Sequence, residues 1–566
     1  MRWALAGLLA GTLFASAPRA EGDAPPVPEA TLAPVIDAID DGGAPEAASG
    51  PDDATLESNG AVIGEITIRA EDIFDPEAPG ENNVFFRAAN KIHIVTREGV
   101  IRRQLLFAPG DRYSARVIAE SARGLRANGY LYDASIRATR YDGERVDIEV
   151  RTRDVWTLQG GIGFGRSGGK NSTRFGLQDQ NFLGSGKDLM LKRTSNVDRT
   201  ETAYRYGDPA LFGTRGRLRL FHSANSDGQA SAVAIERPFY SLETRWALGA
   251  NARQDKRIES LYDLGIVTGR IQHDNQVVTV YAGRSRGIVN GRAKRLLYGF
   301  THETDRYQPA TDAAGALDAP PSEERVVSYP WIGYESLTDG FVTARDLDKL
   351  RRTEDLNLGR EVRARIGLST SAFGGDRTCV LYDASFSQGI NPGNGQLLFV
   401  RALLAGRFAD RAVENVTASG GGRYYLRGGE HTVFFASLRG DVAHDLDPGI
   451  QLLLGGDSGL RGYPLRYLSG DRRVLLTVEE RFYSDRHVLK LVHVGAAVFF
   501  DAGSAWQSGD ASGANRPLLK DIGLGLRFSS SRSSKGSLLK VDLAFPLDRL
   551  PGIAHSQFTI TAGDTF

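Results

Sequence analysis

Cysteine is almost absent from this 566-residue chain, and an excess of charge of one sign is absent too. The single cysteine, Cys379, has no partner for an internal disulfide or for a cysteine-based metal site. The 69 lysines and arginines balance 69 aspartates and glutamates, which gives no support to nucleic-acid binding, because that requires a basic patch. The 9 histidines show no His-Glu-x-x-His or comparable spacing. We therefore expect no metal, no cofactor and no nucleic-acid partner.

Long apolar runs are lacking after the first twenty residues. That first segment has a positive residue, Arg2, an apolar run, and a small-x-small pattern at residues 15–17. These features predict a cleaved export signal over residues 1–20, with the cut left open between Ala17 and Ala20. A core helix or a membrane anchor is the alternative, but an anchor requires about twenty apolar residues. Because mean hydropathy is negative, any later membrane spans must be strands.

Aromatic residues are missing from residues 18–60, which contain ten acidic residues and one basic residue, Arg19. A segment of this composition cannot bury enough apolar surface to offset the entropy of ordering it. We predict a disordered acidic linker over residues 21–60.

Residues 61–153 have the pattern of a small α+β domain. Apolar spacing and the turn signal Asp142-Gly143 define its elements. The sequence predicts, in order, a strand at residues 63–68, helices at residues 84–94 and 114–128, and strands at residues 135–139 and 145–150. The order βααββ in about ninety residues is that of one α+β unit.

Residues 154–566 alternate apolar and polar residues in one strand after another. Both a soluble all-β sandwich and a membrane β-barrel show this alternation. The lengths of the connections between strands distinguish these two folds. Short connections (residues 183–186, 208–212, 238–240 and 484–486) alternate with longer polar ones (residues 253–275, 303–324 and 503–521). Tight turns on one rim and long loops on the other predict a transmembrane antiparallel β-barrel.

The strand pattern also gives a count and an end point. About fifteen candidate strands precede Gly455 and five follow it, up to about twenty in all, an even number as single-chain barrels require. Weak candidates between Tyr262 and Gly340 have loop as an alternative to strand. The last strand, residues 556–566, ends on Phe566. A barrel favours such an ending, because its last strand pairs with its first and leaves no edge.

The best local motif lies in a long loop and reads Leu460-Arg461-Gly462-Tyr463. Two later strands carry the acids Glu479 and Asp501. With these motifs the chain resembles the BamA/TamA superfamily of outer-membrane assembly and translocation barrels, the bacterial surface antigen family, from about residue 62 to the end. The resemblance implies a barrel of 16 strands, a loop that folds back into the lumen, and a periplasmic polypeptide-transport-associated (POTRA) module at residues 61–153.

Physical chemistry supports the loop assignment. By strand alternation Glu479 and Asp501 point into the lumen, where an arginine between two carboxylates forms charge-assisted bonds. Strand phase favours Glu479 over Glu480 as the partner of Arg461. Gly462 allows a close approach to the wall, and Tyr463 packs inside. The alternative is an exposed Arg461 on a mobile loop.

The first and last barrel strands form the second candidate site. Gly161, Gly163 and Gly165 lie on the inward face of the first strand, and glycine weakens a strand. They either make room for the inserted loop or mark a weak seam with the last strand, which carries Gly563 and Phe566. The two readings are compatible. The last strand also matches the polar-x-Gly-x-x-aromatic assembly signal of the family it resembles.

No catalytic constellation is found. The G-x-S-x-G pattern at residues 165–169 lies between two strands rather than between a strand and a helix, and the serine at residue 458 has no matching His and Asp. We therefore expect a protein that is not an enzyme.

The resemblance implies assembly, insertion or translocation of polypeptides at the outer membrane of a Gram-negative cell. The expected partners are unfolded outer-membrane or secreted polypeptides and the lipid bilayer, with periplasmic chaperones or accessory proteins as further candidates. Relatives carry several POTRA modules, or two and a plugging helix, whereas this chain has room for one. A substrate-specific two-partner-type exporter and a passive porin remain alternatives.

Overall fold

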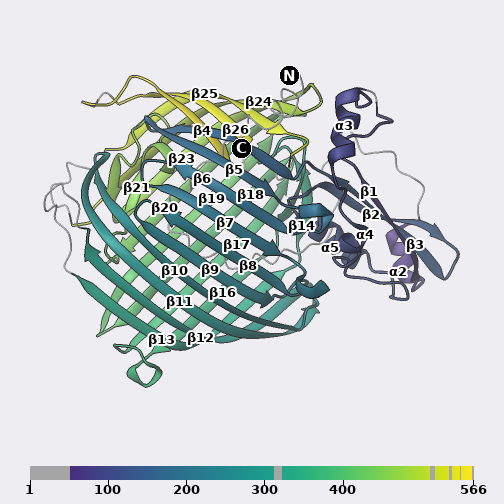
Figure 1. Ribbon diagram of the computed structural model, residues 1–566, viewed down its shortest axis with the longest axis horizontal. Helices are drawn as coiled ribbons and strands as arrows, with labels where there is room; N and C mark the ends of the chain where they lie inside the picture. The colour runs from purple at the N-terminus through teal and green to yellow at the C-terminus, as the bar shows by residue number, and fades with distance from the viewer. Residues whose placement is uncertain are drawn as a thin grey trace.

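A closed barrel and a small α+β domain at one of its ends make up the computed structural model (Figure 1). The structure describes residues 51–78, 80–310, 322–509, 517–533, 538–548 and 550–563. The predicted export signal at residues 1–20, most of the predicted linker at residues 21–60, and Phe566 lie outside the described residues. No helix in the described part is long and apolar enough to cross a membrane.

The barrel contains twenty strands within the described residues, each antiparallel to its neighbours. In sheet order these are β4 (Leu158–Ser167), β5 (Lys170–Asp179), β6 (Asp188–Ser195), β7 (Thr200–Asp208), β8 (Arg217–Asn225), β9 (Gly228–Arg237), β10 (Trp246–Asp263), β11 (Ile266–Val289), β12 (Arg292–Pro309), β13 (Glu323–Thr338), β16 (Glu361–Ser369), β17 (Cys379–Gly393), β18 (Gln396–Ala409), β19 (Ala412–Arg427), β20 (Thr432–His444), β23 (Arg472–Val488), β24 (Val492–Trp506), β25 (Leu519–Ser530), β26 (Leu538–Pro546) and β27 (Gln557–Gly563). The predicted transmembrane barrel is confirmed.

The strand count from the sequence pattern is confirmed, whereas the 16 strands implied by the resemblance are wrong. The weak candidates between residues 262 and 340 are β11, β12 and β13. They looked like loops because their ends are polar. β11 has 24 residues, and about ten suffice to cross a bilayer, so its polar part extends beyond the apolar zone. The loop predicted at residues 253–275 is therefore a hairpin of β10 and β11, and the turn predicted at residues 484–486 lies within β23.

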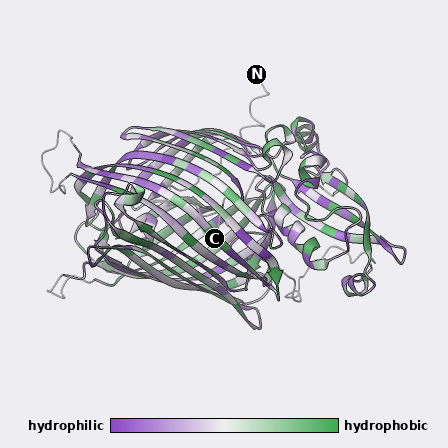
Figure 2. Ribbon diagram, turned by 90° about the horizontal axis from the view of Figure 1, so that it is seen from below, coloured by the Kyte–Doolittle hydropathy of each residue, from purple (hydrophilic) through white to green (hydrophobic). Residues whose placement is uncertain are grey.

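Apolar and polar residues alternate along the strands, as Figure 2 shows. On β4, Ile162 is 67% exposed while Gly163 is buried. On β24, Val498 is exposed while Phe499 is buried. The exposed members form an apolar outer surface suited to lipid, and the buried members line the lumen.

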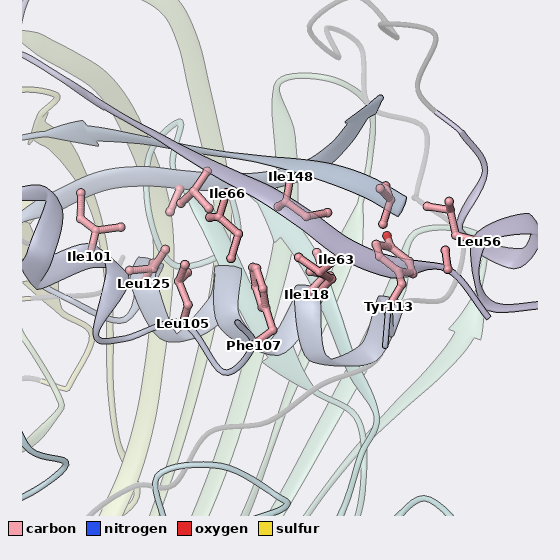
Figure 3. Packing of buried hydrophobic residues seen from close by; sticks show 14 of the residues in the cluster. Leu56, Ile63, Ile66, Ile101, Leu105, Phe107, Tyr113, Ile118, Leu125 and Ile148 are labelled. Carbon is pink, nitrogen blue, oxygen red and sulfur yellow. The ribbon is translucent and has the colours of Figure 1, made fainter. Parts of the chain in front are cut away.

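The small domain comprises residues 53–154. Its sheet has the order β1-β3-β2, with β1 (Val62–Glu71) parallel to β3 (Arg145–Asp154) and β2 (Leu131–Tyr141) antiparallel to β3. The helices are α2 (Asp53–Ser58), α3 (Val84–Ile92), α4 (Glu98–Arg102) and α5 (Ala115–Arg126). Ile118 and Leu125 of α5 pack on Ile66 and Ile148 of the sheet (Figure 3). The predicted α+β fold is confirmed, and α2 and α4 are additions to it.

The linker prediction is wrong from residue 53 onward, where α2 forms. Asp52 caps this helix through the Thr55 amide, and Leu56 is fully buried in the domain core. Tyr113 donates a hydrogen bond of 2.6 Å to Asp53. One buried leucine and a few specific polar contacts outweigh the acidic composition, and composition alone does not reveal them.

Two rims follow from the connectivity. The small domain lies at the end where β4 begins, here called the near rim, and the opposite end is called the far rim. Most near-rim connections are short, but residues 339–360 form a hairpin of β14 (Phe341–Arg345) and β15 (Thr353–Asn357). At the far rim, residues 445–471 form a long loop that contains β21 (Leu452–Leu454) and β22 (Leu468–Gly470).

Candidate functional site

The far-rim loop, residues 445–471, folds into the barrel. Leu460 and Tyr463 are fully buried, and the Tyr463 hydroxyl donates a hydrogen bond of 2.8 Å to the Lys520 carbonyl. The Gly462 amide donates to Asp521 at 3.0 Å. A Cβ added at Gly462 would lie 2.8 Å from the Asp521 Cβ, so only glycine permits this approach to the wall. The four residues singled out by the sequence therefore hold the loop against the inner surface.

Arg461 lies between the two acids predicted for it. Its Nε and Nη2 donate to Asp501 at 2.8 and 3.1 Å, and its Nη1 donates to Glu479 at 2.9 Å. The guanidinium carbon also lies 3.4 Å from the centroid of the Phe499 ring. Such a paired and stacked arginine is stable when all its partners are present and costly when one is removed.

An ion pair on β23 extends this cluster toward the near rim. Glu479 Oε2 accepts a bond of 2.9 Å from Arg481 Nε, while its other oxygen binds Arg461. Arg481 Nη1 then donates to the Leu347 carbonyl at 2.7 Å and to Asp348 at 3.3 Å. Leu347 and Asp348 belong to the near-rim hairpin. Two loops from opposite rims are thus joined inside the barrel through adjacent inward positions of one strand.

The near-rim hairpin, residues 339–360, covers the near end of the lumen. The Glu354 carboxylate accepts hydrogen bonds from the amides of residues 347–349, which shapes the tip. Leu347 and Leu350 pack against inward-facing residues of the wall. These are Leu397, Tyr425, Val433, Phe435, Tyr483, Ala497 and Leu538. This hairpin was not predicted from the sequence. Its one sequence signal is a connection of more than twenty residues on a rim of short turns.

One face of α5 joins the small domain to the barrel. Arg116, Glu120, Arg123 and Arg126 follow the spacing of one helical face. Arg116 pairs with Glu243 at 2.7 Å, and Glu120 accepts the Leu242 amide at 3.1 Å. Toward the hairpin, the Arg123 guanidinium lies 4.4 Å from the centroid of the Phe341 ring, and Arg126 Nε donates to Asp355 at 2.9 Å.

Burial changes the chemistry of this interface. It raises the pKa of the Glu120 carboxyl to about 7, against the opposing effects of the Leu242 amide and the Arg116 guanidinium. Burial likewise raises the pKa of Asp339, which precedes β14, to about 6. The contact between helix and hairpin is therefore sensitive to protonation.

The seam between β4 and β27 is thinly paired. Among the described residues these strands pair at one position, Ile560 with Arg166, whereas β26 and β27 pair at seven. Gly161, Gly163 and Gly165 lie on the inward face of β4, and a Cβ at Gly165 would lie 3.4 Å from the Ile560 carbonyl oxygen. Gly563 pairs with Leu538 of β26.

Both ends of the seam are held from outside the strand ladder. At the far rim, the Leu465 amide of the loop donates to the Gly168 carbonyl at 3.2 Å, in the turn between β4 and β5. At the near rim, the Trp156 amide donates to the Arg532 carbonyl at 2.6 Å. The inserted loop therefore contacts the hairpin that forms one side of the seam. Within the described part of the chain, no group of three His, Cys, Asp or Glu could hold a metal ion.

Comparison with known proteins gives a family match for the C-terminal part of this barrel. Residues 380–566 match the Omp85 superfamily domain. The match begins within β17 and covers the strands that follow it. The resemblance inferred from the sequence is confirmed over these residues, which include Arg461, Glu479, Asp501 and β27.

Individual relatives are distant. The chain is 28% identical to the outer membrane protein assembly factor BamA of Neorickettsia risticii over 28% of its own length and 23% of that protein, so the match spans about a quarter of the relative. Among solved structures, BamA from Haemophilus ducreyi lacking POTRA domains 1–3 is 16% identical, with a TM-score of 0.37, and covers 89% of this chain and 85% of that one. CdiB from Acinetobacter baumannii is 13% identical, with a TM-score of 0.39, over 89% and 74%.

Proposed function

We propose that this protein inserts or translocates unfolded polypeptides at the outer membrane and handles them at the seam between β4 and β27. The observation that carries the proposal is that these strands, as far as the structure describes them, pair only at Ile560 and Arg166, in an otherwise continuous ladder. Parting them exposes unpaired main-chain donors and acceptors, which can template the strand of a client. Main-chain hydrogen bonds between β4 and β27 are replaced by equivalent bonds to the client strand. Because the number of bonds is preserved, the exchange requires no energy from a nucleotide.

The small domain is the candidate receiver of the client. In this proposal it is a periplasmic POTRA module, and the near rim faces the periplasm. Its sheet has β2 at one edge, and an extended client can add to such an edge through main-chain bonds that tolerate many sequences. The other edge is partly occupied, because Val62 of β1 bridges Arg112 and the Ile63 amide binds the Asp111 carbonyl. We therefore assign client binding to β2.

A passive porin is less consistent with the filled lumen. A porin requires an open polar channel, whereas the Arg461 loop and the near-rim hairpin both enter this barrel and meet through Glu479 and Arg481. A dedicated exporter uses the same seam and differs from an insertase in its clients.

A reversible lock on the seam tests the proposal. In a Cys379→Ala background, the pair Arg166→Cys and Ile560→Cys places two thiols opposite each other across the seam. Oxidation should abolish complementation in cells depleted of the native protein, and a reductant should restore it. The control pair, Val541→Cys and Ile560→Cys, links β26 to β27 and should leave function intact. A locked seam that still supports growth and a normal envelope would overturn the proposal.

The accompanying census of envelope and secreted proteins decides the client class. Broad loss of outer-membrane barrels on locking indicates an insertase, and loss of one secreted protein indicates a dedicated exporter.

A further inference from the structure

Helix α3 turns an apolar face away from the protein. Val84, Phe85 and Ile92 are 63%, 66% and 70% exposed. With Ala88 they occupy a stripe about 100° wide, since residues 84, 88 and 92 follow i, i+4 spacing. A helix in a soluble domain normally buries such a stripe, but no residue of α3 is buried. The apolar face of α3 is therefore available to contact lipid or another molecule.

The opposite face fixes α3 across the near end of the seam. Phe86 stacks on Phe74 with ring centroids 4.0 Å apart, and the Arg532 guanidinium, which follows β25, lies 4.8 Å from the Phe74 ring. Past the C-terminal end of α3, the Arg97 amide donates to the Gly184 carbonyl at 3.0 Å, in the turn between β5 and β6. The segment is therefore held on both sides of β27 and β4, at the rim of the barrel.

A groove of about 640 Å³ separates the C-terminal end of α3 from the barrel wall. Ile92 and Ile94 line one side. The other side is formed by outward-facing residues of the barrel, including Leu158, Leu177 and Leu191, each about half exposed. The volume lies in the range of sites for small ligands. The apolar stripe of α3 and the lipid-facing wall are thus one continuous surface.

We propose that α3 lies in the phospholipid leaflet at the near rim and that the groove holds a phospholipid acyl chain beside the seam. Arg87 and Lys91 flank the stripe, as cationic side chains do when a helix lies at the level of lipid phosphates. Two other turns at the near rim also expose large apolar side chains, Phe212 at 92% and Leu489 at 78%. These side chains would contact the same lipid leaflet as α3. The small domain is therefore anchored to the membrane as well as to the barrel.

A polypeptide client is the competing occupant. A helix has no free main-chain edge for strand addition, and the stripe continues into the exposed apolar wall of the barrel, which is suited to lipid. Both observations favour phospholipid.

Site-directed fluorescence tests the lipid contact in the full-length protein. In a Cys379→Ala background, Phe85→Cys and Ile92→Cys are labelled with an environment-sensitive fluorophore and reconstituted into phosphatidylethanolamine and phosphatidylglycerol vesicles. Glu144→Cys, exposed in the turn between β2 and β3, is the matched control on the same domain. Heat-modifiable electrophoretic mobility verifies that each barrel is folded.

Lipid carrying a nitroxide on its upper acyl chain should quench the labels at residues 85 and 92 several-fold more than the label at residue 144. Aqueous iodide should show the reverse order. Equal quenching at the three positions overturns the proposal. Protection from iodide that arises only when an unfolded polypeptide is added assigns the face to a client and overturns it as well.

Discussion

Glu479 and Arg481 form an ion pair of 2.9 Å on the inner face of β23, and each binds a loop from a different rim. Glu479 holds Arg461 of the far-rim loop, and Arg481 holds Asp348 and the Leu347 carbonyl of the near-rim hairpin. The far-rim loop and the near-rim hairpin, which both fill the lumen, are thus held by the same strand. A change at either loop is transmitted through these two side chains, which gives the predictions below a common physical basis.

Removing the Arg461 side chain should open the lumen. Arg461→Ala removes the cation that the buried acids Glu479 and Asp501 share and leaves Glu479 paired with Arg481 alone, at a cost of about 3–5 kcal/mol. The loop should leave the wall, and single-channel recordings should change from low, flickering conductance to larger and longer openings. Arg461→Lys keeps the positive charge but cannot bind both acids in the same geometry. Its conductance should lie between those of the native protein and Arg461→Ala. A large steady current in the native protein that Arg461→Ala does not alter would favour a porin.

Breaking the contact between α5 and the hairpin should free the small domain. Arg126→Asp removes a pair that is largely buried, at a cost of about 2–5 kcal/mol. The distribution of spin-label distances between the small domain and a near-rim turn should broaden. The double variant Arg126→Asp with Asp355→Arg restores opposite charges and should narrow it again. A broad distribution in the double variant would show that the ion pair is not what positions the domain.

Docking of the small domain should weaken as pH rises. The Glu120 pKa of about 7 in the docked state exceeds its usual value of 4.5, because burial of the carboxyl and the nearby Asp339 raise it by more than the Leu242 amide, Arg116 and Arg123 lower it. The stabilisation is therefore complete below pH 4.5 and is lost as pH rises through about 7. The same spin-label distances, recorded across this range, should broaden toward high pH. Glu120→Gln should remove most of this dependence, and an unchanged titration would exclude Glu120 as its source.

Gly168 should be far less replaceable than its neighbour Gly169. Both have positive φ, +51° and +81°, so alanine costs about 1–2 kcal/mol of backbone strain at either position. Only at Gly168 would a Cβ meet the inserted loop, 2.1 Å from the Leu465 nitrogen, whereas Gly169 has its nearest neighbour at 3.8 Å. Gly168→Ala should therefore increase proteolysis of the far-rim loop, and Gly169→Ala should not. Equal proteolysis would mean that the loop does not brace this turn.

The alternation of apolar and polar residues with a period of two was sufficient to predict most of the fold. It predicted twenty strands and the inward phase of Glu479 and Asp501, because a strand places alternate residues on one face whatever its partners are. The contact between Arg481 and Asp348 was not predictable in this way. The two residues are 133 positions apart, and Asp348 lies on a hairpin whose conformation depends on Glu354 and on packing inside the barrel. The buried Leu56 in α2 was hidden for the same reason, since its environment is tertiary.

Photocrosslinking at the seam tests the central claim most directly. A photoreactive amino acid replaces either Ile560, where β27 pairs with β4, or Leu524, which is exposed on β25 and does not border the seam. In cells synthesising outer-membrane and secreted proteins, residue 560 should form adducts with unfinished polypeptides, and residue 524 should not. Adducts absent from both positions, or equally abundant at both, would contradict a seam that handles clients.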